Sequence, residues 1–303
     1  MPPSRSSWLE RGNPDATNMA RVFTLEGSGG PHLRLDLERD LNDQQRAAVV
    51  CGDGPKLVIA GAGSGKTHTI TYRVAYLMSK GIPASSILLA TFTNKAAREM
   101  LSRVEGLTGS NVGHIWGGTF HSIGNRILRH YAKLLGLASS YSILDEEDQR
   151  DLIKVCVTEA KIKVEEKRFP APGILQSMIS FSFNTQQPLE AVVEGRYPHF
   201  IQWTKEIEAI RSRYAVKKRH AQALDYDDLL GWWLTLLQEH PTTTQRLGQQ
   251  FRHILVDEYQ DTNTIQAEIV ERLATHNDRN LMVVGDDAQS IYAFRGAHYD
   301  NIL

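Results

Sequence analysis

Ala60-Gly61-Ala62-Gly63-Ser64-Gly65-Lys66-Thr67 is the stretch that decides the fold. A short apolar run at 57–59 precedes it and is typical of a buried strand. After it, Ile70, Val74 and Leu77 recur at the spacing of one face of a helix. Because a strand, a glycine-rich loop ending in Lys-Thr and a helix follow in this order, the sequence predicts a phosphate-binding P-loop rather than a chance glycine-rich turn.

The chemistry of such a loop assigns a role to each part of it. Glycines let backbone N–H groups turn toward phosphate oxygens, and the helix N-terminus adds partial positive charge there. We expect Lys66 to reach the β- and γ-phosphates and the Thr67 hydroxyl to bind Mg²⁺. The first position of the pattern, usually glycine, is Ala60 here.

Composition limits the class of protein. With 303 residues, 41% hydrophobic and 23% charged, the chain is expected to form about two packed domains. Its net charge of -1 means that any nucleic-acid site must be a local basic groove. Cys51 and Cys156 are too few for a disulfide framework and lack metal-ligand spacing. Neither a transmembrane run nor a signal-peptide core is evident, so we expect a cytoplasmic protein with no membrane contact.

The N-terminal part reads as an extension followed by a helix. Residues 1–40 are rich in Pro, Gly and Ser, and we expect them to be irregular and mostly disordered. Translation could begin at Met19 rather than Met1, which intact-mass measurement would decide. In the helix expected at 41–50, Asn42 suits an N-cap. Gln45 has two possible roles, capping-box partner or reader of adenine, and spacing alone leaves both open.

Two further strand ends carry polar and aromatic residues. The strand expected at 87–90 leads into Thr91-Phe92-Thr93-Asn94-Lys95, where α/β folds bind ligands. Phe92 could stack on a base and Asn94 and Lys95 could contact phosphate; alternatively, Phe92 is core and Lys95 solvated. A strand near 114–116 precedes His121, for which capping or phosphate contact is favoured over metal binding.

The segment 124–222 lacks further strand–helix alternation and is expected to be a helical insertion. Its basic run Lys217-Lys218-Arg219-His220 is either a phosphate patch or, more commonly for such runs, a solvated face.

Two adjacent carboxylates end the next strand, expected at 254–256. Asp257 and Glu258 at the end of a buried strand would be costly without a cation or hydrogen bonds. With a P-loop in the same chain, Asp257 is expected to hold Mg²⁺ through water and Glu258 to orient and deprotonate the attacking water. The alternative is a helix N-cap by Asp257 with Glu258 in the first turn.

A last strand, at 281–284, leads into a run extending to residue 297. Here Gln289 could sense the γ-phosphate, Tyr292 and Phe294 could stack on bases, and Arg295 could hold a DNA phosphate. Alone, the run would be read as an aromatic turn packed into the core.

Together these segments resemble the N-terminal half of UvrD/Rep-type superfamily 1 DNA helicases. The matching runs, in order, are 41–45, 60–67, 91–100, 118–122, 257–262 and 285–297, and the resemblance extends over 41–303. It implies an α/β fold: a RecA-like P-loop NTPase lobe with a parallel sheet at 41–123 and 223–303. This lobe would be interrupted by an all-helical insertion subdomain at 124–222. It also implies an ATP- and Mg²⁺-dependent motor that moves 3′ to 5′ on single-stranded DNA and separates duplex.

The resemblance assigns roles residue by residue. It implies catalytic roles for Lys66, Glu258 and Gln289, and Mg²⁺ binding by Thr67 and Asp257. The implied nucleotide contacts are Gln45, Ala60, Gly61, Ala62, Gly63, Ser64, Gly65, Lys66, Thr67 and His68. The implied DNA contacts are Thr91, Phe92, Asn94, His121, Tyr292, Phe294 and Arg295.

The sequence also departs from the family pattern. His68 replaces an arginine that helps to bind nucleotide, so affinity is expected to be lower or pH-dependent. Phe294 replaces a tryptophan and keeps an aromatic face, and Ala288 stands where an acidic residue is common.

The chain ends at Leu303, where the family's second RecA-like lobe would follow, so we expect half a helicase. Its partners would be single-stranded DNA, single-strand/duplex junctions and a chain carrying the second lobe. The alternative is a module that binds nucleotide and single-stranded DNA without significant turnover on its own.

Overall fold

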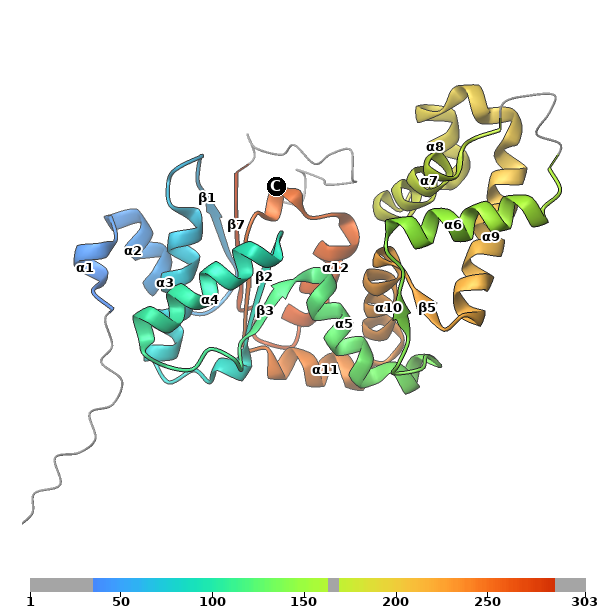
Figure 1. Cartoon of the computed structure of the whole chain (residues 1–303). Coiled ribbons are helices and arrows are strands. Elements are labelled where there is room, and N and C mark those ends of the chain that lie inside the picture. Colours follow the sequence, from blue (N-terminus) through green and yellow to red (C-terminus); the bar gives the residue numbers. More distant parts are fainter. Residues whose placement is uncertain (1–34, 163–168, 287–303) are drawn as a thin grey trace, which may run out of the picture.

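A five-stranded parallel sheet forms the centre of the molecule, in the order β1-β7-β6-β2-β3 (Figure 1). The computed structural model describes residues 35–162 and 169–286. The strands are β1 (Lys56–Ile59), β2 (Ile87–Thr91), β3 (Trp116–Thr119), β6 (His253–Val256) and β7 (Leu281–Gly285). Every pair is parallel, so all five carboxyl ends lie on one edge of the sheet. The predicted α/β class with a parallel sheet is confirmed.

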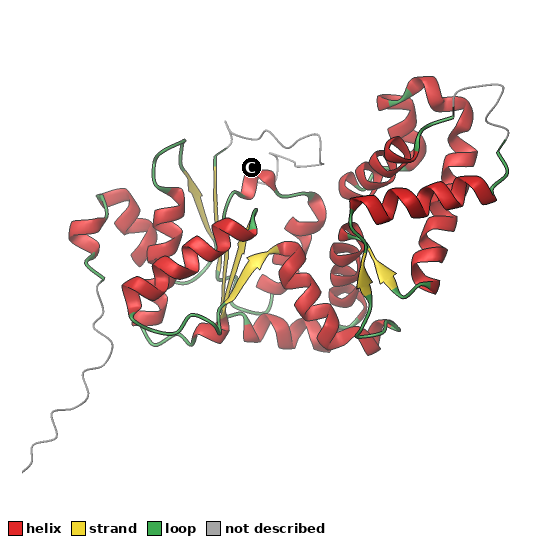
Figure 2. Ribbon diagram, in the orientation of Figure 1, coloured by secondary structure: helices red, strands yellow, loops and turns green. Residues whose placement is uncertain are grey.

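Helices cover both faces of the sheet, as Figure 2 shows. On one face, α3 (Lys66–Ser79) and α4 (Asn94–Thr108) share a core with β2, β6 and β7. On the other lie α5 (Phe120–Tyr131), α10 (Tyr226–Glu239), α11 (Pro241–Gln250) and α12 (Thr264–Ala274). Two apolar cores enclosing one sheet hold the strand ends in fixed positions.

The position of each strand explains its burial. Each residue of the central strands β2 and β6 is buried, as expected for strands covered on both faces. In β1, which is at the edge of the described sheet, Leu57 and Ile59 are 46% and 60% exposed. The prediction of a buried strand at 57–59 was therefore wrong for two of its three side chains, Leu57 and Ile59, because alternate residues of a strand point to the same face and this face of β1 is open.

The segment before the P-loop is more ordered than predicted. Asp36 caps the short helix α1 (Leu37–Asp40), which falls within the supposedly irregular residues 1–40. α2 (Asp43–Val50) follows, and Leu41 and Val49 pack against Tyr72 of α3. The rest of the predicted extension, including Met19, lies outside the described residues.

The insertion has a core of its own, built by four helices and separated from the sheet in Figure 1. These are α6 (Glu146–Glu159), α7 (Pro172–Thr185), α8 (Leu189–Arg196) and α9 (Thr204–His220). Where the chain enters and leaves, β4 (Ser142–Ile143) pairs with β5 (Ala223–Leu224). The segment predicted to be all-helical thus also contains a short strand, because its two ends lie close enough to pair.

Short 3₁₀ turns also occur in both parts of the described chain. They are η1 (Ala84–Ser86), η2 (Ala132–Leu135), η3 (Pro198–Trp203) and η4 (Tyr259–Asp261).

Helix α5 runs across the predicted boundary at 123/124 and packs on the sheet along with α10. The two helices approach closely at Gly124, where an added Cβ would lie 3.0 Å from the Trp233 ring. The domain limits 41–123, 124–222 and 223–303 remain predictions.

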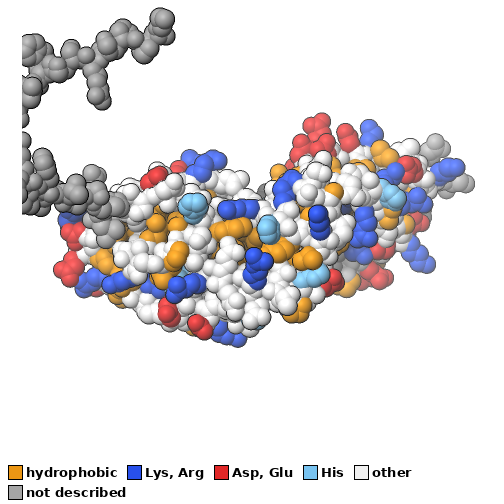
Figure 3. All heavy atoms as spheres, turned by 90° about the horizontal axis from the view of Figure 1, so that it is seen from below, with side chains coloured by type: hydrophobic (Ala, Val, Ile, Leu, Met, Phe, Trp, Pro, Cys, Tyr) orange, Lys and Arg blue, Asp and Glu red, His pale blue; other side chains and the backbone are white. Residues whose placement is uncertain are grey.

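The surface is mixed in charge. In Figure 3, Lys, Arg, Asp and Glu side chains are scattered over the face shown, in keeping with the net charge of -1. None of the described helices is both long and apolar enough to cross a membrane.

Candidate nucleotide and DNA site

The loop between β1 and α3 has the backbone that a P-loop requires. Gly63 and Gly65 have φ of 74° and 85°, in the left-handed region that favours glycine. A Cβ on Gly65 would also lie 2.6 Å from Nε2 of Gln45. Ala60 is absent from the described residues with positive φ, which explains why alanine is tolerated at the first position of the pattern.

Gln45 uses both ends of its side-chain amide. Its Oε1 accepts from the backbone N–H of Asn42 at 3.1 Å, and the Asn42 side chain accepts in return from the Gln45 backbone. Its Nε2 donates to the Ser64 carbonyl at 2.9 Å, which ties α2 to the P-loop. The capping role is therefore present, together with a contact to the loop that spacing did not reveal. Adenine recognition stays a prediction.

Lys66 lies in a polar enclosure at the start of α3. Its side chain is 8% exposed; Nζ donates to the Ala60 carbonyl at 3.1 Å and lies 3.5 Å from Oδ2 of Asp286. Asp286 directly follows β7, the strand paired with β1. The lysine is thus held beneath the loop, where a phosphate chain bound to the loop would meet it.

Asp257 has the properties of a metal-holding carboxylate. It follows β6 and is 4% exposed, and its Oδ1 has no hydrogen-bond partner among the described residues. Burial, and then the charge of Glu258, raises the pKa of Asp257 to about 7, while a hydrogen bond from Thr67 opposes that rise. A divalent cation at this point would satisfy the orphaned oxygen and favour the ionised form.

The donor set suits Mg²⁺ bound to a nucleotide. In the described part of the chain, no group of three or more His, Cys, Asp or Glu side chains is placed so that it could hold a metal ion by itself. Mg²⁺ bound with nucleotides typically takes only one or two protein ligands, and phosphate oxygens and water complete its shell. Thr67 and Asp257 together meet that requirement.

Glu258 has a strained backbone. Its φ and ψ are 51° and 48°, a left-handed conformation that is uncommon for a residue with a Cβ and is concentrated at functional sites. Glu258, not Asp257, occupies the N-cap position of η4, so the helix-capping alternative is not observed. Oε2 of Glu258 accepts a 2.8 Å hydrogen bond from Nε2 of Gln260.

A small cavity of about 40 Å³ joins the paired carboxylates to the predicted DNA contacts. Its lining residues are Thr91, Phe92, Thr119, Phe120, His121, Asp257, Glu258, Asp261, Thr262 and Gln266. Three of the predicted DNA contacts and the proposed catalytic base therefore surround one space. Residues predicted for two different tasks are close neighbours.

The predicted DNA contacts differ in exposure. Phe92 is 38% exposed, so the core alternative does not describe it, whereas Thr91 is buried and donates from its hydroxyl to the Thr93 carbonyl. Asn94 is exposed at the start of α4. Burial lowers the pKa of His121 to about 4, so its imidazole is neutral at physiological pH. His121 could therefore contact DNA by hydrogen bonding or ring packing, without charge.

Two other polar features of the sequence have structural contacts. Nε2 of His68 lies 3.1 Å from the Asp40 carbonyl and its ring packs on Tyr72, so it ties α1 to α3. Lys218, from the basic run, is 7% exposed and contacts Asp225 and Asp228. The phosphate-patch alternative was therefore wrong for Lys218, because neighbouring carboxylates bury and neutralise it.

Four predicted site residues, Gln289, Tyr292, Phe294 and Arg295, lie outside the described residues. Conversely, sequence reasoning missed Gln260 and Asp286, whose contacts join the P-loop side of the site to Glu258. Gln260 stands two residues after Glu258 in the matching run 257–262, and that proximity was the only signal in the sequence.

This arrangement defines the class of protein: an α/β lobe of the P-loop nucleotide-binding type. The paired acids follow β6, and β7 lies between β6 and β1, the strand that precedes the P-loop. The chain matches the UvrD/REP helicase N-terminal domain over residues 41–303, and it belongs to that family.

Curated relatives agree with this assignment. The chain is 42% identical to ATP-dependent DNA helicase UvrD1 of Mycobacterium tuberculosis over 281 residues, covering 90% of this chain and 36% of the relative. It is 42% identical to ATP-dependent DNA helicase PcrA of Bacillus subtilis over 274 residues, with the same coverage. PcrA of Staphylococcus epidermidis is 39% identical over 268 residues, covering 88% and 36%. The chain thus spans about a third of the length of these relatives.

Proposed function

We propose that this chain is the N-terminal, ATP-hydrolysing part of a DNA helicase that moves 3′ to 5′ on single-stranded DNA. The observation that carries the proposal is the shared cavity: Glu258, Phe92 and His121 line one space beside Asp257. ATP hydrolysis and DNA binding would then occur at adjacent side chains. Single-strand/duplex junctions are the proposed substrate, and a chain carrying the second lobe is a proposed partner.

The proposed chemistry is hydrolysis of the terminal phosphoanhydride. Backbone N–H groups of the P-loop and the Lys66 ammonium would bind the phosphate oxygens. Thr67 and Asp257 would hold Mg²⁺, which neutralises phosphate charge when bound. Glu258 would accept a proton from water as the water oxygen attacks the γ-phosphorus; the bond to the ADP oxygen breaks, releasing ADP and phosphate.

A second function has one observation in its favour: the chain covers only 36% of its helicase relatives. On that ground it could bind nucleotide and single-stranded DNA without significant turnover when alone. The two proposals differ in turnover, not in the site.

The test is ATP hydrolysis by the purified chain with and without single-stranded DNA, comparing wild type with Glu258→Gln. Glu190→Gln, an exposed glutamate on α8, is the matched control. DNA-stimulated hydrolysis that Glu258→Gln abolishes and Glu190→Gln preserves would support the enzyme. Mg-ATP binding without turnover would support the binding module, and absence of binding would contradict both. Strand displacement on 3′- and 5′-tailed duplexes then tests polarity.

A further inference from the structure

One side chain of the insertion reaches the loop that carries the proposed catalytic base. Asn184, near the end of α7, accepts a 2.7 Å hydrogen bond at Oδ1 from Nδ2 of Asn263. Asn263 is the N-cap of α12 and directly follows the run 257–262, in which Glu258 lies. We propose that Asn184 is a positioning residue for ATP hydrolysis: through Asn263 it holds this loop, and with it Glu258, in place.

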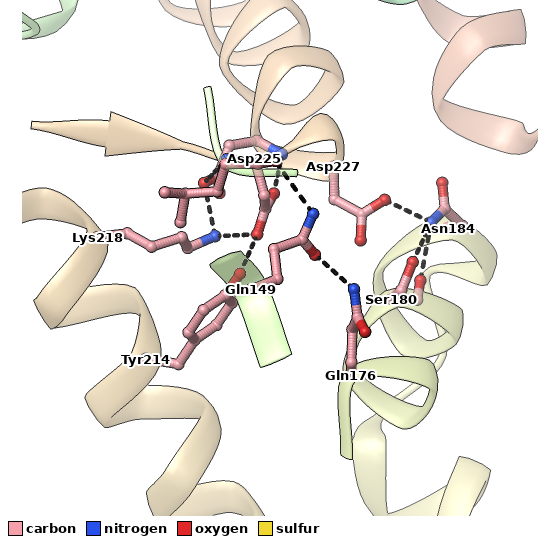
Figure 4. A network of polar contacts seen from close by, with 10 residues as sticks. Gln149, Gln176, Ser180, Asn184, Tyr214, Lys218, Asp225 and Asp227 are labelled. Carbon is pink, nitrogen blue, oxygen red and sulfur yellow. Dashed lines mark hydrogen bonds and ion pairs between the residues drawn. The ribbon is translucent and has the colours of Figure 1, made fainter. Parts of the chain in front are cut away.

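The hydrogen bonds around Asn184 allow one orientation of its amide group. Nδ2 donates to the Ser180 carbonyl and to Oδ1 of Asp227, both at 2.8 Å, as Figure 4 shows. Only the nitrogen of a carboxamide can donate, so the oxygen must face Asn263. The Asn263 amide is fixed in the same way, because its Oδ1 accepts from the Gln266 backbone at 2.8 Å. Its Nδ2 is therefore directed at Asn184.

The bond lies where water does not easily replace it. Asn263 is 7% exposed, and Asn184 is half-buried. Phe183, the residue before Asn184, packs against the lobe at Gly231, where an added Cβ would lie 2.9 Å from the phenyl ring. The end of α7 is thus seated on α10 and α12. Loss of the Asn184 side chain would leave a buried donor of Asn263 without a partner, which is unfavourable unless the loop moves.

The loop between Glu258 and Asn263 is short and internally bonded. The backbone N–H of Asp261 donates to the Glu258 carbonyl at 2.9 Å, and the Thr262 hydroxyl donates to the Tyr259 carbonyl at 2.6 Å. Because these bonds leave little slack, a displacement of Asn263 also displaces Glu258. The left-handed backbone of Glu258, with φ of 51°, persists only where the surrounding structure holds it.

Asn184 also joins two helices that border the cavity at Glu258. Its second partner, Asp227, lies in the first turn of α10, and the first residue of that turn packs its ring against His121 of the cavity wall. The first turn of α12 carries Gln266, which lines the same cavity. Misplacement of a reacting group by about 1 Å can lower a rate by about 100-fold, so bonds that fix this wall affect turnover.

This inference rests on the proposed ATP hydrolysis, and the experiment separates the two. Steady-state hydrolysis by the full chain, with saturating oligothymidylate, gives kcat and the KM for ATP. Asn184→Leu removes the bonds to Asn263 and Asp227. Asn263→Ser keeps a hydroxyl that can cap α12 but removes the donor to Asn184. Gln187→Leu, which replaces an exposed amide just beyond α7, is the matched control.

We expect each single variant to lower kcat by about tenfold and to change the KM for ATP by less than about twofold, because the P-loop is untouched while Glu258 loses its support. The double variant should lose no more than about 20-fold, rather than the roughly 100-fold of independent effects, since both changes break the same bond. Amide hydrogen exchange should become faster at 257–266 and stay unchanged at 60–67 in both single variants. Gln187→Leu should match wild type in all three measurements.

Wild-type kcat in Asn184→Leu and Asn263→Ser would overturn the inference and leave the proposed function standing. Independent losses in the double variant would overturn it as well, because the two side chains would then act separately. Faster exchange throughout the chain would also do so, since it would show a role in folding alone. Failure of the wild-type chain to hydrolyse ATP would overturn the proposed enzyme and this inference with it.

Discussion

The carboxamide of Gln260 donates a 2.8 Å hydrogen bond from Nε2 to Oε2 of Glu258. Its Oε1 accepts from the backbone N–H of Asp286 at 3.0 Å, and the Asp286 carboxylate lies 3.5 Å from Nζ of Lys66. Gln260 is 2% exposed, so water does not compete effectively for these bonds. The proposed base, on the loop after β6, is thereby oriented by a side chain that is anchored at the end of β7.

We expect Gln260→Leu to lower the rate of ATP hydrolysis by about 10- to 100-fold with little effect on nucleotide affinity, because Glu258 loses its orientation. The buried Asp286 N–H would also lose a partner, which costs about 1–3 kcal/mol of unfolding free energy. Single-turnover hydrolysis and urea unfolding measure the two effects. Gln238→Leu, an exposed glutamine on α10, is the control. Wild-type values of both quantities in Gln260→Leu would show that the glutamine neither orients Glu258 nor stabilises the loop.

Local sequence order was sufficient to predict the parts of the site that are built locally. The P-loop follows β1 directly, and the paired acids follow β6 directly, so a strand and the residues after it were enough to identify both. Gln260 could not be found in this way. Its role depends on a bond to Asp286, 26 residues away, and on the adjacency of β6 and β7 in the sheet.

Burial was harder to predict than secondary structure. Leu57 and Ile59 are as apolar as residues of a central strand, but strand order puts β1 at the edge of the described sheet. Lys218 lies in a basic run that would ordinarily be solvated, yet a turn of the chain brings Asp225 and Asp228 against it. In each case the deciding contact comes from the tertiary arrangement, which composition and periodicity do not contain.

Gly65 provides a test of the P-loop backbone. We expect Gly65→Ala to destabilise the protein by about 1–3 kcal/mol, because φ is 85° and the new Cβ would approach Gln45 Nε2 to 2.6 Å. Gly61→Ala should stay within about 0.5 kcal/mol of wild type, since its Cβ meets no described atom within 4 Å. Chemical denaturation of the three proteins measures the difference. Equal destabilisation by both substitutions would argue against the loop conformation described.

Lys218 and Lys217 are adjacent residues in different surroundings. Lys218→Met should destabilise by about 3–5 kcal/mol, because it leaves Asp225 and Asp228 charged and unpaired at a buried site. Lys217→Met removes a more exposed pair with Glu159 and should cost less than about 1 kcal/mol. Urea unfolding at neutral pH compares them. If the two variants were equally stable, Lys218 would not be the buried counter-ion that the contacts indicate.

Asp227 provides a prediction about pH. Burial, and then the negative charge of Asp225, raises the pKa of Asp227 to about 7, whereas an aspartate in an unfolded chain has a pKa of about 3.9. Between these values the folded protein keeps a proton that the unfolded chain has released. The contribution of Asp227 to stability therefore falls as pH rises through this window, and it is constant above the folded-state pKa.

Asp227→Asn removes this titration and keeps an oxygen that can accept the 2.8 Å hydrogen bond from Asn184. We expect the free energy of unfolding of the variant, relative to wild type, to increase by about 2–4 kcal/mol from about pH 4 to about pH 7 and then to level off. Urea unfolding across this range measures the difference, and Asp151→Asn, at an exposed position on α6, is the control. A difference that is independent of pH would mean that Asp227 titrates alike in both states and that its carboxylate is well solvated. A difference that decreased with rising pH would mean that the folded state favours the charged form, so that the hydrogen bonds from Asn184 and Ser180 and the charge of Lys218 outweigh the effect of burial.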